Sequence, residues 1–329
     1  MSENRGVRRD VIPWLVGFVG LAAAFVAVIA ILNGTMYSAS GFVSSYIDAL
    51  NRHDAATAAT LPGVHATKGV STALLTDDAL GTIANVKLAS DKTGKDGTHA
   101  VTYSYTLGGR RETSTFEVSQ KPAFLGLFSR WSFARSPLAT VSVSALHDQR
   151  FRANGTEVTS PTTHGTPSSY LVFAPGLYVF DHKSTFLAAS PIDAAVTEPG
   201  SVTPVQVNVQ ANAEFVADVK MELSSYFTKC ATQKVLLPTS CPFGKSFSNR
   251  VVSTPEWSMV KKPPVTIVPD GNTGKWLVPN AAGAAHLKVK VQSLFDGSIS
   301  TFNADVPFDV SYDITIGANN HLTITALDG

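Results

Sequence analysis

The chain has 329 residues, with 26 Lys and Arg against 25 Asp and Glu, a formal net charge of +1 and two cysteines. This even balance excludes the strongly basic surface by which proteins bind nucleic acid. It also predicts no polybasic patch of the kind that attracts anionic lipid headgroups. We therefore expect no nucleic acid among its partners.

The first element in chain order is an uncharged apolar run of 22 residues, Val11–Leu32. At about 1.5 Å per residue a helix of this length reaches roughly 33 Å, enough to cross a hydrocarbon core of about 30 Å. Trp14 lies near one end, where an aromatic ring favours the membrane interface. The alternatives are a buried core helix and a signal peptide cleaved near Ser38–Ser40, but the run exceeds the usual apolar region of about 7–15 residues. We predict an uncleaved transmembrane anchor at 11–32 in a lipid bilayer.

Charges on either side of the run predict its orientation. Arg5, Arg8 and Arg9 precede it, and the next basic residue after it is Arg52. Because basic flanking residues stay in the cytoplasm, residues 1–10 are expected to form a cytoplasmic tail of a single-pass cell-membrane protein. The rest of the chain is then extracytoplasmic, and so is its function, because the tail is too short to form a domain.

The roughly 300 residues beyond the span suit two or three domains. A short linker, 33–39, precedes three units with different patterns, 40–137, 138–210 and 211–329. The first and third begin with a helix and continue with antiparallel strands, whereas the second contains only short strands. The predicted fold class is therefore α+β, with one transmembrane helix and two helix-plus-sheet domains flanking a small all-β, sandwich-like domain.

The first unit opens with an amphipathic helix, for which Ser40 is the predicted N-cap and Pro62-Gly63 the stop. Its apolar stripe at helical spacing consists of Phe42, Tyr46, Ala49, Leu50 and His53. A second short helix is predicted at 76–84, with Thr76 as its cap. Alternating residues then predict a hairpin of 99–107 with 112–118, and Trp131 begins another strand.

The second unit has no helical stripe, and Asn154-Gly155 predicts a tight hairpin turn between two of its short strands. The third unit begins with another helical stripe from Phe215 to Phe227. Its predicted strands are 250–260, 265–268, 276–278, 286–294, 302–316 and 322–326.

The two cysteines, Cys230 and Cys241, lie close together in the third unit. Outside the cytoplasm such a pair indicates a disulfide, which on the chain-entropy model stabilises by about 3 kcal/mol. Half of a metal site and two free thiols are the alternatives. No histidine lies beside the pair to complete a tetrahedral zinc shell, so we favour the disulfide.

Short motifs in the chain resemble those of known envelope proteins. The helix 41–50, followed by antiparallel strands ending in Trp131, resembles an NTF2-like (cystatin-like) module of bacterial membrane proteins, and Pro175–Val179 looks like a turn-and-strand of small β modules in envelope proteins. The whole order is similar to the teicoplanin-resistance-associated membrane protein family, and Cys230-Ala231 with Cys241–Phe243 resembles its actinobacterial relatives. The resemblance implies two NTF2-like domains around a small β domain. The family's cytoplasmic zinc ribbon is absent, because residues 1–10 contain no Cys.

Two fragments match motifs of penicillin-binding proteins, Ser258–Lys261 as S-x-x-K and Lys92–Gly94 as K-T-G. The serine of such a site opens a helix, but Pro263 and Pro264 favour extended backbone here. The K-T-G precedes the serine and lies in a charged turn. We therefore predict Ser258 as a strand residue and Lys92 as a turn residue, and we assign no catalytic residue.

The remaining candidates for chemistry are weak. The eight histidines are scattered singly, so we predict no metal and no cofactor. His53 is the one polar residue of the first helix's apolar stripe that could enter an NTF2-like pocket. The hypothesis is a non-catalytic envelope protein that binds or scaffolds a cell-wall precursor, a glycan or a protein partner. An enzyme or small-ligand binder using an NTF2-like pocket is the alternative.

Overall fold

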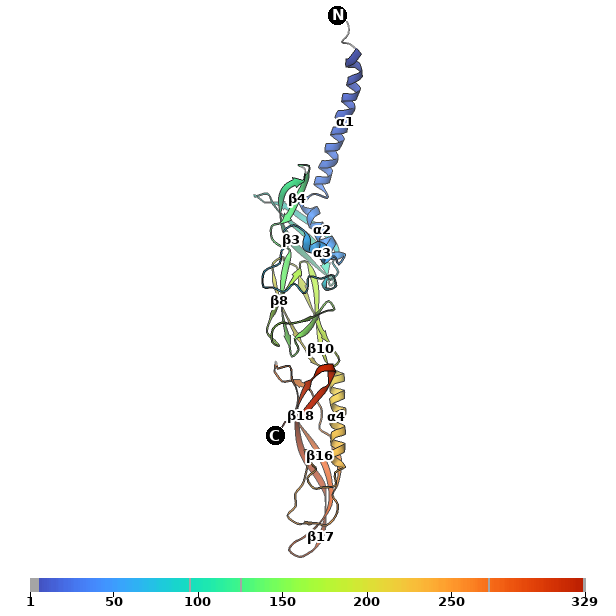
Figure 1. The fold of residues 1–329 in the computed structure, drawn as a ribbon, viewed down its shortest axis with the longest axis vertical. Coiled ribbons are helices and arrows are strands. Elements are labelled where there is room, and N and C mark those ends of the chain that lie inside the picture. Colours follow the sequence, from blue (N-terminus) through green and yellow to red (C-terminus); the bar gives the residue numbers. More distant parts are fainter. Residues whose placement is uncertain (1–5, 95, 125, 272, 328–329) are drawn as a thin grey trace.

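The computed structural model describes residues 6–94, 96–124, 126–271 and 273–327. The molecule is a long rod (Figure 1), with helix α1 at one end. A helix-and-sheet domain, a β-sandwich and a second helix-and-sheet domain follow along the rod, and we call them the N-terminal domain, the sandwich and the C-terminal domain. The predicted α+β class with mostly antiparallel sheets is confirmed.

Helix α1 spans Gly6–Gly34 and contains the predicted run 11–32. Its segment Trp14–Gly34 has a mean hydropathy of 2.8, and none of it is buried against the rest of the protein. By length and composition this helix can cross a membrane. Of the residues expected to orient it, Arg8 and Arg9 lie within α1, as does Val11, and Arg5 lies outside the described residues.

A short turn, residues 35–38, follows α1. The N-terminal domain then begins with α2, Ala39–Asn51. The predicted N-cap Ser40 is wrong, because the extended Ser38 caps the helix by accepting a hydrogen bond from the Gly41 N–H at 2.9 Å. The predicted single helix ending at Pro62-Gly63 is also wrong, because the segment forms two helices. His53 has a left-handed φ of 56°, which ends the first helix before α3, Ala55–Thr60, begins.

A four-stranded antiparallel sheet in the order β1-β2-β3-β4 packs against these helices. The strands are β1 Ala84–Thr93, β2 Thr98–Leu107, β3 Arg110–Phe124 and β4 Phe128–Phe133. The predicted hairpin is the β2–β3 pair and is confirmed. The predicted helix 76–84 is wrong, since only a 3₁₀ turn, Asp77–Ala79, forms there and the chain then enters β1.

The sandwich has a three-stranded sheet, β11-β5-β8, and a five-stranded sheet, β12-β10-β9-β6-β7. Its β5 and β11 pair in parallel, and the predicted turn at Asn154-Gly155 joins β6 to β7. The strands are β5 Leu138–Leu146, β6 Arg150–Ala153, β7 Thr156–Thr159, β8 Ser168–Phe173, β9 Gly176–Lys183, β10 Leu187–Val196, β11 Val202–Asn208 and β12 Gln210–Ala211.

The C-terminal domain lays α4, Ala213–Ala231, against a sheet dominated by the hairpin of β16 and β17 (Figure 1). Two predicted strands, 276–278 and 286–294, are one strand, because β16 continues across an irregularity between Val278 and Ala281. The strands are β13 Arg250–Val251, β14 Glu256–Lys261, β15 Val268–Pro269, β16 Trp276–Gln292, β17 Ile299–Ile316 and β18 Leu322–Ala326, with a 3₁₀ turn at Ala318–Asn320.

The three domains are interlocked rather than strung on linkers. Leu74 and Ala79 of the N-terminal domain are buried in the core of the sandwich, while Leu171 and Phe173 of the sandwich are buried in the core of the N-terminal domain. At the other joint one core runs from the sandwich into the C-terminal domain. The ring of Phe215 there lies 5.3 Å from that of Phe186 and 5.9 Å from that of Trp276.

Candidate functional site at the joint of the sandwich and the C-terminal domain

A cleft of about 610 Å³ opens where the sandwich meets the C-terminal domain. Loops at the ends of strands form both walls, which is where binding residues commonly lie on a rigid scaffold. The sandwich contributes His147, Asp148, Gln149, Arg150, Thr159, His164 and Leu187, and the C-terminal domain contributes Thr273, Gly274, Trp276 and residues 316–320.

The floor of the cleft is fixed by packing. Trp276 is only 1% exposed, so its ring supports the site from below and offers no open face to a ligand. The His147 ring stands edge-on to it with centroids 6.2 Å apart, and His147 Nδ1 lies 2.6 Å from the Gly271 carbonyl oxygen. That oxygen can only accept, so Nδ1 carries a proton.

An ion pair supplies the charged groups of the cleft. The Arg150 guanidinium donates to both Asp148 carboxylate oxygens, Nε to Oδ1 at 3.1 Å and Nη2 to Oδ2 at 2.7 Å. Partial burial pushes the pKa of Asp148 up, but the side-chain and backbone hydrogen bonds from Arg150 outweigh it and hold that pKa below its ordinary value. The pair is thus ionised at neutral pH and nearly neutral in sum.

Left-handed backbone gathers at this cleft. Among the described residues, seven other than glycine have positive φ, and three of them line the cleft: His147 at 67°, Asn319 at 57° and Asn320 at 59°. Residues in sparsely populated backbone regions tend to cluster at functional sites. His164 completes the wall, packed so closely on Gly274 that a Cβ there would lie 3.0 Å from its ring.

A serine and a histidine lie hydrogen-bonded beside the cleft, and their geometry argues against a nucleophile. His182 is buried; its Nδ1 donates to the Arg150 carbonyl at 2.9 Å, and its Nε2 accepts from Ser184 Oγ at 3.1 Å. Asp148 Oδ2 lies 4.0 Å from Nε2, the nitrogen that faces the serine, so it does not orient the ring from the opposite side. Ser184 Oγ also accepts from the Leu187 N–H, so the pair closes the β9–β10 turn.

A smaller pocket of about 290 Å³ lies between α4 and strands β17 and β18. Tyr226 and Tyr312 line it beside Glu222. Burial, and to a lesser degree the neighbouring Tyr226, raises the pKa of the Tyr312 hydroxyl, so this group stays protonated at neutral pH. The Tyr226 hydroxyl donates to the Ser240 carbonyl at 2.5 Å, which ties the pocket to the cysteine loop.

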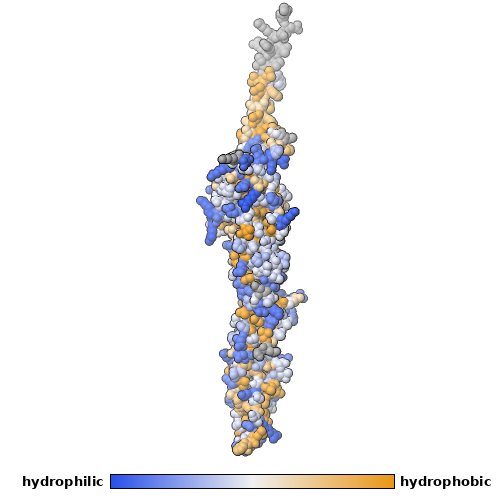
Figure 2. Space-filling view, turned by 90° about the vertical axis from the view of Figure 1, so that its left-hand side faces the viewer, coloured by the Kyte–Doolittle hydropathy of each residue, from blue (hydrophilic) through white to orange (hydrophobic). Residues whose placement is uncertain are grey.

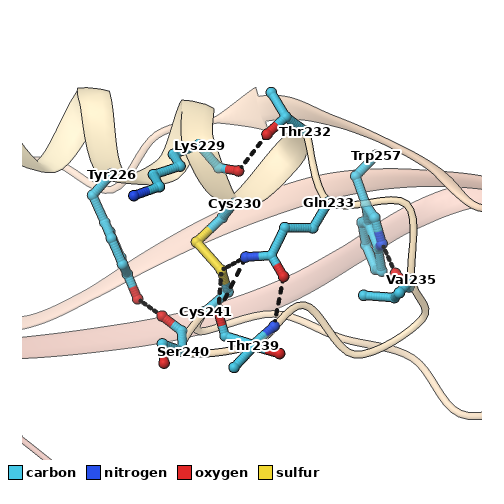
Figure 3. Close-up of a disulfide and its surroundings, with 10 residues drawn as sticks. All are labelled: Tyr226, Lys229, Cys230, Thr232, Gln233, Val235, Thr239, Ser240, Cys241 and Trp257. Carbon is cyan, nitrogen blue, oxygen red and sulfur yellow. Dashed lines mark hydrogen bonds between the residues drawn. A yellow bond between two sulfur atoms is a disulfide. The ribbon is translucent and has the colours of Figure 1, made fainter.

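The predicted disulfide between Cys230 and Cys241 is present and joins the end of α4 to the following loop (Figure 3). Within that loop the Gln233 amide accepts from the Thr239 N–H at 2.8 Å and donates to its carbonyl at 3.1 Å. The Trp257 indole donates to the Val235 carbonyl at 2.8 Å. The loop is therefore braced internally by Gln233, joined to α4 by the disulfide and bonded to strand β14 through Trp257.

The fragments that matched catalytic motifs are in extended backbone. Ser258 lies in β14 opposite His286, as a strand residue, which removes the helical geometry of S-x-x-K. Lys92 is not a turn residue as predicted but lies in β1, opposite Ala100. His53 is exposed, and its Nδ1 lies 3.3 Å from the Asp77 carbonyl oxygen. Within the described part of the chain no His, Cys, Asp or Glu residues are grouped as a metal site.

Comparison with known proteins gives no assignment. No family model matches this chain, no curated protein is detectably similar to it, and no solved structure matches its fold. The sequence did not predict the cleft; its local signals are the polar stretch His147–Arg150 between two strands and the Asn319-Asn320 pair.

Proposed function

We propose that the protein is a single-pass, membrane-anchored envelope protein whose extracytoplasmic rod binds a cell-wall component or a protein partner without chemical turnover. The observation that carries the proposal is the cleft between the sandwich and the C-terminal domain, an open polar site held between two interlocked domains on a rod that begins with the apolar helix α1. The arginines before α1 support the orientation.

Rigidity of the rod supports a presenting role. The interlocked cores leave no free linker between the three domains, so the cleft is held in a fixed position relative to the N-terminal domain. The order of elements also supports the resemblance to teicoplanin-resistance-associated membrane proteins, with NTF2-like domains on either side of the sandwich.

Chemistry of the cleft favours an uncharged polar ligand. The guanidinium of Arg150 is compensated by Asp148, and the other exposed polar groups include the Asn319 and Asn320 amides and the His147 ring. Planar amides and bidentate groups suit hydroxyl and acetamido groups, since each ligand group can find a donor and an acceptor. A glycan of the cell wall fits this description better than a nucleic acid or a strongly anionic peptide.

Binding of peptidoglycan fragments to the full-length protein in nanodiscs tests the proposal. Arg150→Gln removes the guanidinium fork, and we expect its dissociation constant to rise about tenfold, as for the loss of a hydrogen bond to a charged group. Arg152→Gln is the matched control, because Arg152 forms an equivalent pair with Asp181 and does not line the cleft. Failure of the unmodified protein to bind, or equal loss in both variants, would refute the site.

The orientation has its own test. Protease added to intact spheroplasts is expected to digest the rod and leave only α1 and the tail protected. Recovery of a large protected fragment would place the rod in the cytoplasm and overturn the proposal.

A second candidate function, a small-ligand or enzymatic site, rests on the pocket with Tyr226 and Tyr312. We propose this function only as the alternative. Among the described residues, the only hydroxyl groups that line the pocket are those of the two tyrosines, so the pocket has no serine or threonine that could act as a nucleophile. Native mass spectrometry of the full-length protein would detect a retained small molecule, and Ala326→Trp, which narrows the pocket, should release it.

A further inference from the structure

The end of the rod opposite α1 carries an exposed apolar apex, and Figure 2 shows hydrophobic colour at this end. Leu294, Phe295 and Ile299, at the turn between β16 and β17, are 72%, 99% and 63% exposed. We call these three residues the tip. Scattered exposed apolar residues are normal, but a near-fully exposed Phe beside two aliphatic residues at the pole of a rod needs an explanation.

The tip is held in a built turn. The Ser293 N–H donates to the Ser298 carbonyl at 2.8 Å, and the Gly297 N–H donates to the Ser293 carbonyl at 3.1 Å. Ser293 Oγ accepts from the Phe295 N–H at 3.2 Å. These backbone N–H groups are bonded within the turn, which lowers the cost of moving its apolar side chains out of water.

Basic residues surround the tip. Arg250 lies opposite Gln292 in the β13–β16 pair, and Lys290 lies two residues before Gln292 in β16. Lys245 Nζ lies 6.0 Å from the centroid of the Phe302 ring, and all three basic side chains are exposed. Segment 231–255, which forms part of this end, contains three basic residues and no acidic one. Asp296 is the carboxylate of the turn, and its Oδ1 accepts from the Ser298 N–H and hydroxyl.

The other pole shows the same combination beside the apolar helix. The β3–β4 turn exposes Phe124 and Leu127, with Lys121 and Arg130 paired just behind them. The Asn33 amide at the end of α1 donates to the Leu127 carbonyl at 2.8 Å, so this turn lies where the membrane surface would be. An apolar turn with basic residues behind it therefore also lies beside the helix whose length and composition indicate lipid.

We propose that the tip inserts into a second, anionic lipid surface, so that the rod bridges the anchoring membrane and another lipid layer. Three side chains of about 150–200 Å² each cover too little area for a stable protein interface, which needs about 800 Å² per partner. Insertion into lipid needs no complementary shape and gains from apolar burial together with attraction of bases to anionic headgroups. The even charge of the whole chain conceals this local asymmetry.

A fluorescent probe at the apex tests the insertion directly. Both native cysteines are joined in the disulfide, so Phe295→Cys creates a unique thiol for an environment-sensitive dye on the full-length protein in neutral nanodiscs. Vesicles of phosphatidylcholine with phosphatidylglycerol should shift its emission to the blue, and lipid-borne quenchers should quench it. Met221→Cys on the outer face of α4, where the native side chain is 67% exposed, is the matched control and should not respond.

Two further variants separate the apolar and electrostatic contributions. Leu294→Ser with Ile299→Ser should weaken vesicle binding about tenfold or more, through loss of apolar burial. Arg250→Gln with Lys290→Gln should weaken binding to anionic vesicles only and reduce its salt dependence. No dye response to anionic vesicles would overturn the proposal. So would a response that requires a second copy of the protein or an envelope protein in place of lipid.

Discussion

The N-terminal and C-terminal domains share an order of elements, a helix followed by an antiparallel sheet, yet they join the sandwich in different ways. The N-terminal domain keeps its own core, around Tyr46 and Phe116, and exchanges a few side chains with its neighbour. The C-terminal domain has no separate core, because Phe215 and Trp276 belong to the same continuous cluster as the sandwich.

This difference bears on how the rod unfolds. Elements that share a core are expected to unfold as one cooperative unit, whereas a separately packed domain can open on its own. We therefore expect the sandwich and the C-terminal domain to form one unit and the N-terminal domain another. The joint cleft lies inside the larger unit, which favours a site of fixed shape.

Trp276→Ala gives the largest expected effect. Removing this buried side chain should destabilise the protein by about 3–5 kcal/mol. Because the cavity lies in the shared core, hydrogen exchange should increase in the sandwich as well as in the C-terminal domain. Phe116→Ala is the control in the other core, and its effect should stay within the N-terminal domain. Confinement of the Trp276→Ala effect to the C-terminal domain would show two separate units.

Removing the disulfide should have the next largest effect, about 3 kcal/mol for a loop of this length. Cys230 is 2% exposed and packs in the shared core. Loss of the disulfide should therefore lower the melting temperature of a single transition in which the sandwich and the C-terminal domain unfold together. The measurement is calorimetry of the Cys230→Ala, Cys241→Ala double variant. A lower melting temperature of the N-terminal domain in this variant would contradict its unfolding as a separate unit.

Tyr46→Phe probes the joint of the N-terminal domain and should cost about 1 kcal/mol. Burial raises the pKa of the Tyr46 hydroxyl well above its ordinary value, so it remains a donor to the Ala174 carbonyl, 2.9 Å away in the sandwich. Tyr103→Phe is the matched control, because its hydroxyl bonds the Ser40 carbonyl within its own domain at 2.9 Å. Only Tyr46→Phe should weaken coupling between the two transitions in calorimetry.

His286→Gln should give the smallest effect, visible only in the pH dependence of stability. Hydrogen bonds to Asp305 and then Asn303 raise the pKa of His286 above its ordinary 6.5. A raised folded-state pKa contributes stability that is fully present below pH about 6.5 and is lost as pH rises through the folded-state value. The melting temperature of the native protein should therefore fall toward that of His286→Gln as pH increases from 6 to 8. Equal pH dependence of the two proteins would contradict the assignment.

The sequence predicted the elements that bury one regular face. The apolar helix, the stripe of α4, the β2–β3 hairpin and the cysteine pair all follow from periodicity or composition. Strand β1 was missed because it is a largely exposed edge strand and carries no apolar alternation. The sequence predicted two strands, 276–278 and 286–294, whereas β16 is one strand that passes Pro279 through an irregularity in the ladder.

No pattern in the sequence predicts the cleft, for a different reason. His147 and the carbonyl of Gly271 that fixes it are 124 residues apart in sequence and belong to different domains. Each wall taken alone is an ordinary polar loop, and the site exists only when the joint forms. The tip has no signal in the whole-chain charge, because that sum averages over the basic residues near it.

The short stretch around Ser71 has a consequence for the sandwich as an isolated object. Strand β8 is the edge of its sheet, and Ser71 covers that edge as a parallel bridge, accepting from the Leu171 N–H at 2.8 Å and donating to the Ser169 carbonyl at 3.1 Å. A fragment beginning at Leu138 would leave this edge open, and open edges template pairing with other chains. The N-terminal domain therefore protects its neighbour from aggregation and domain swapping, and truncations that remove it should form oligomers through β8.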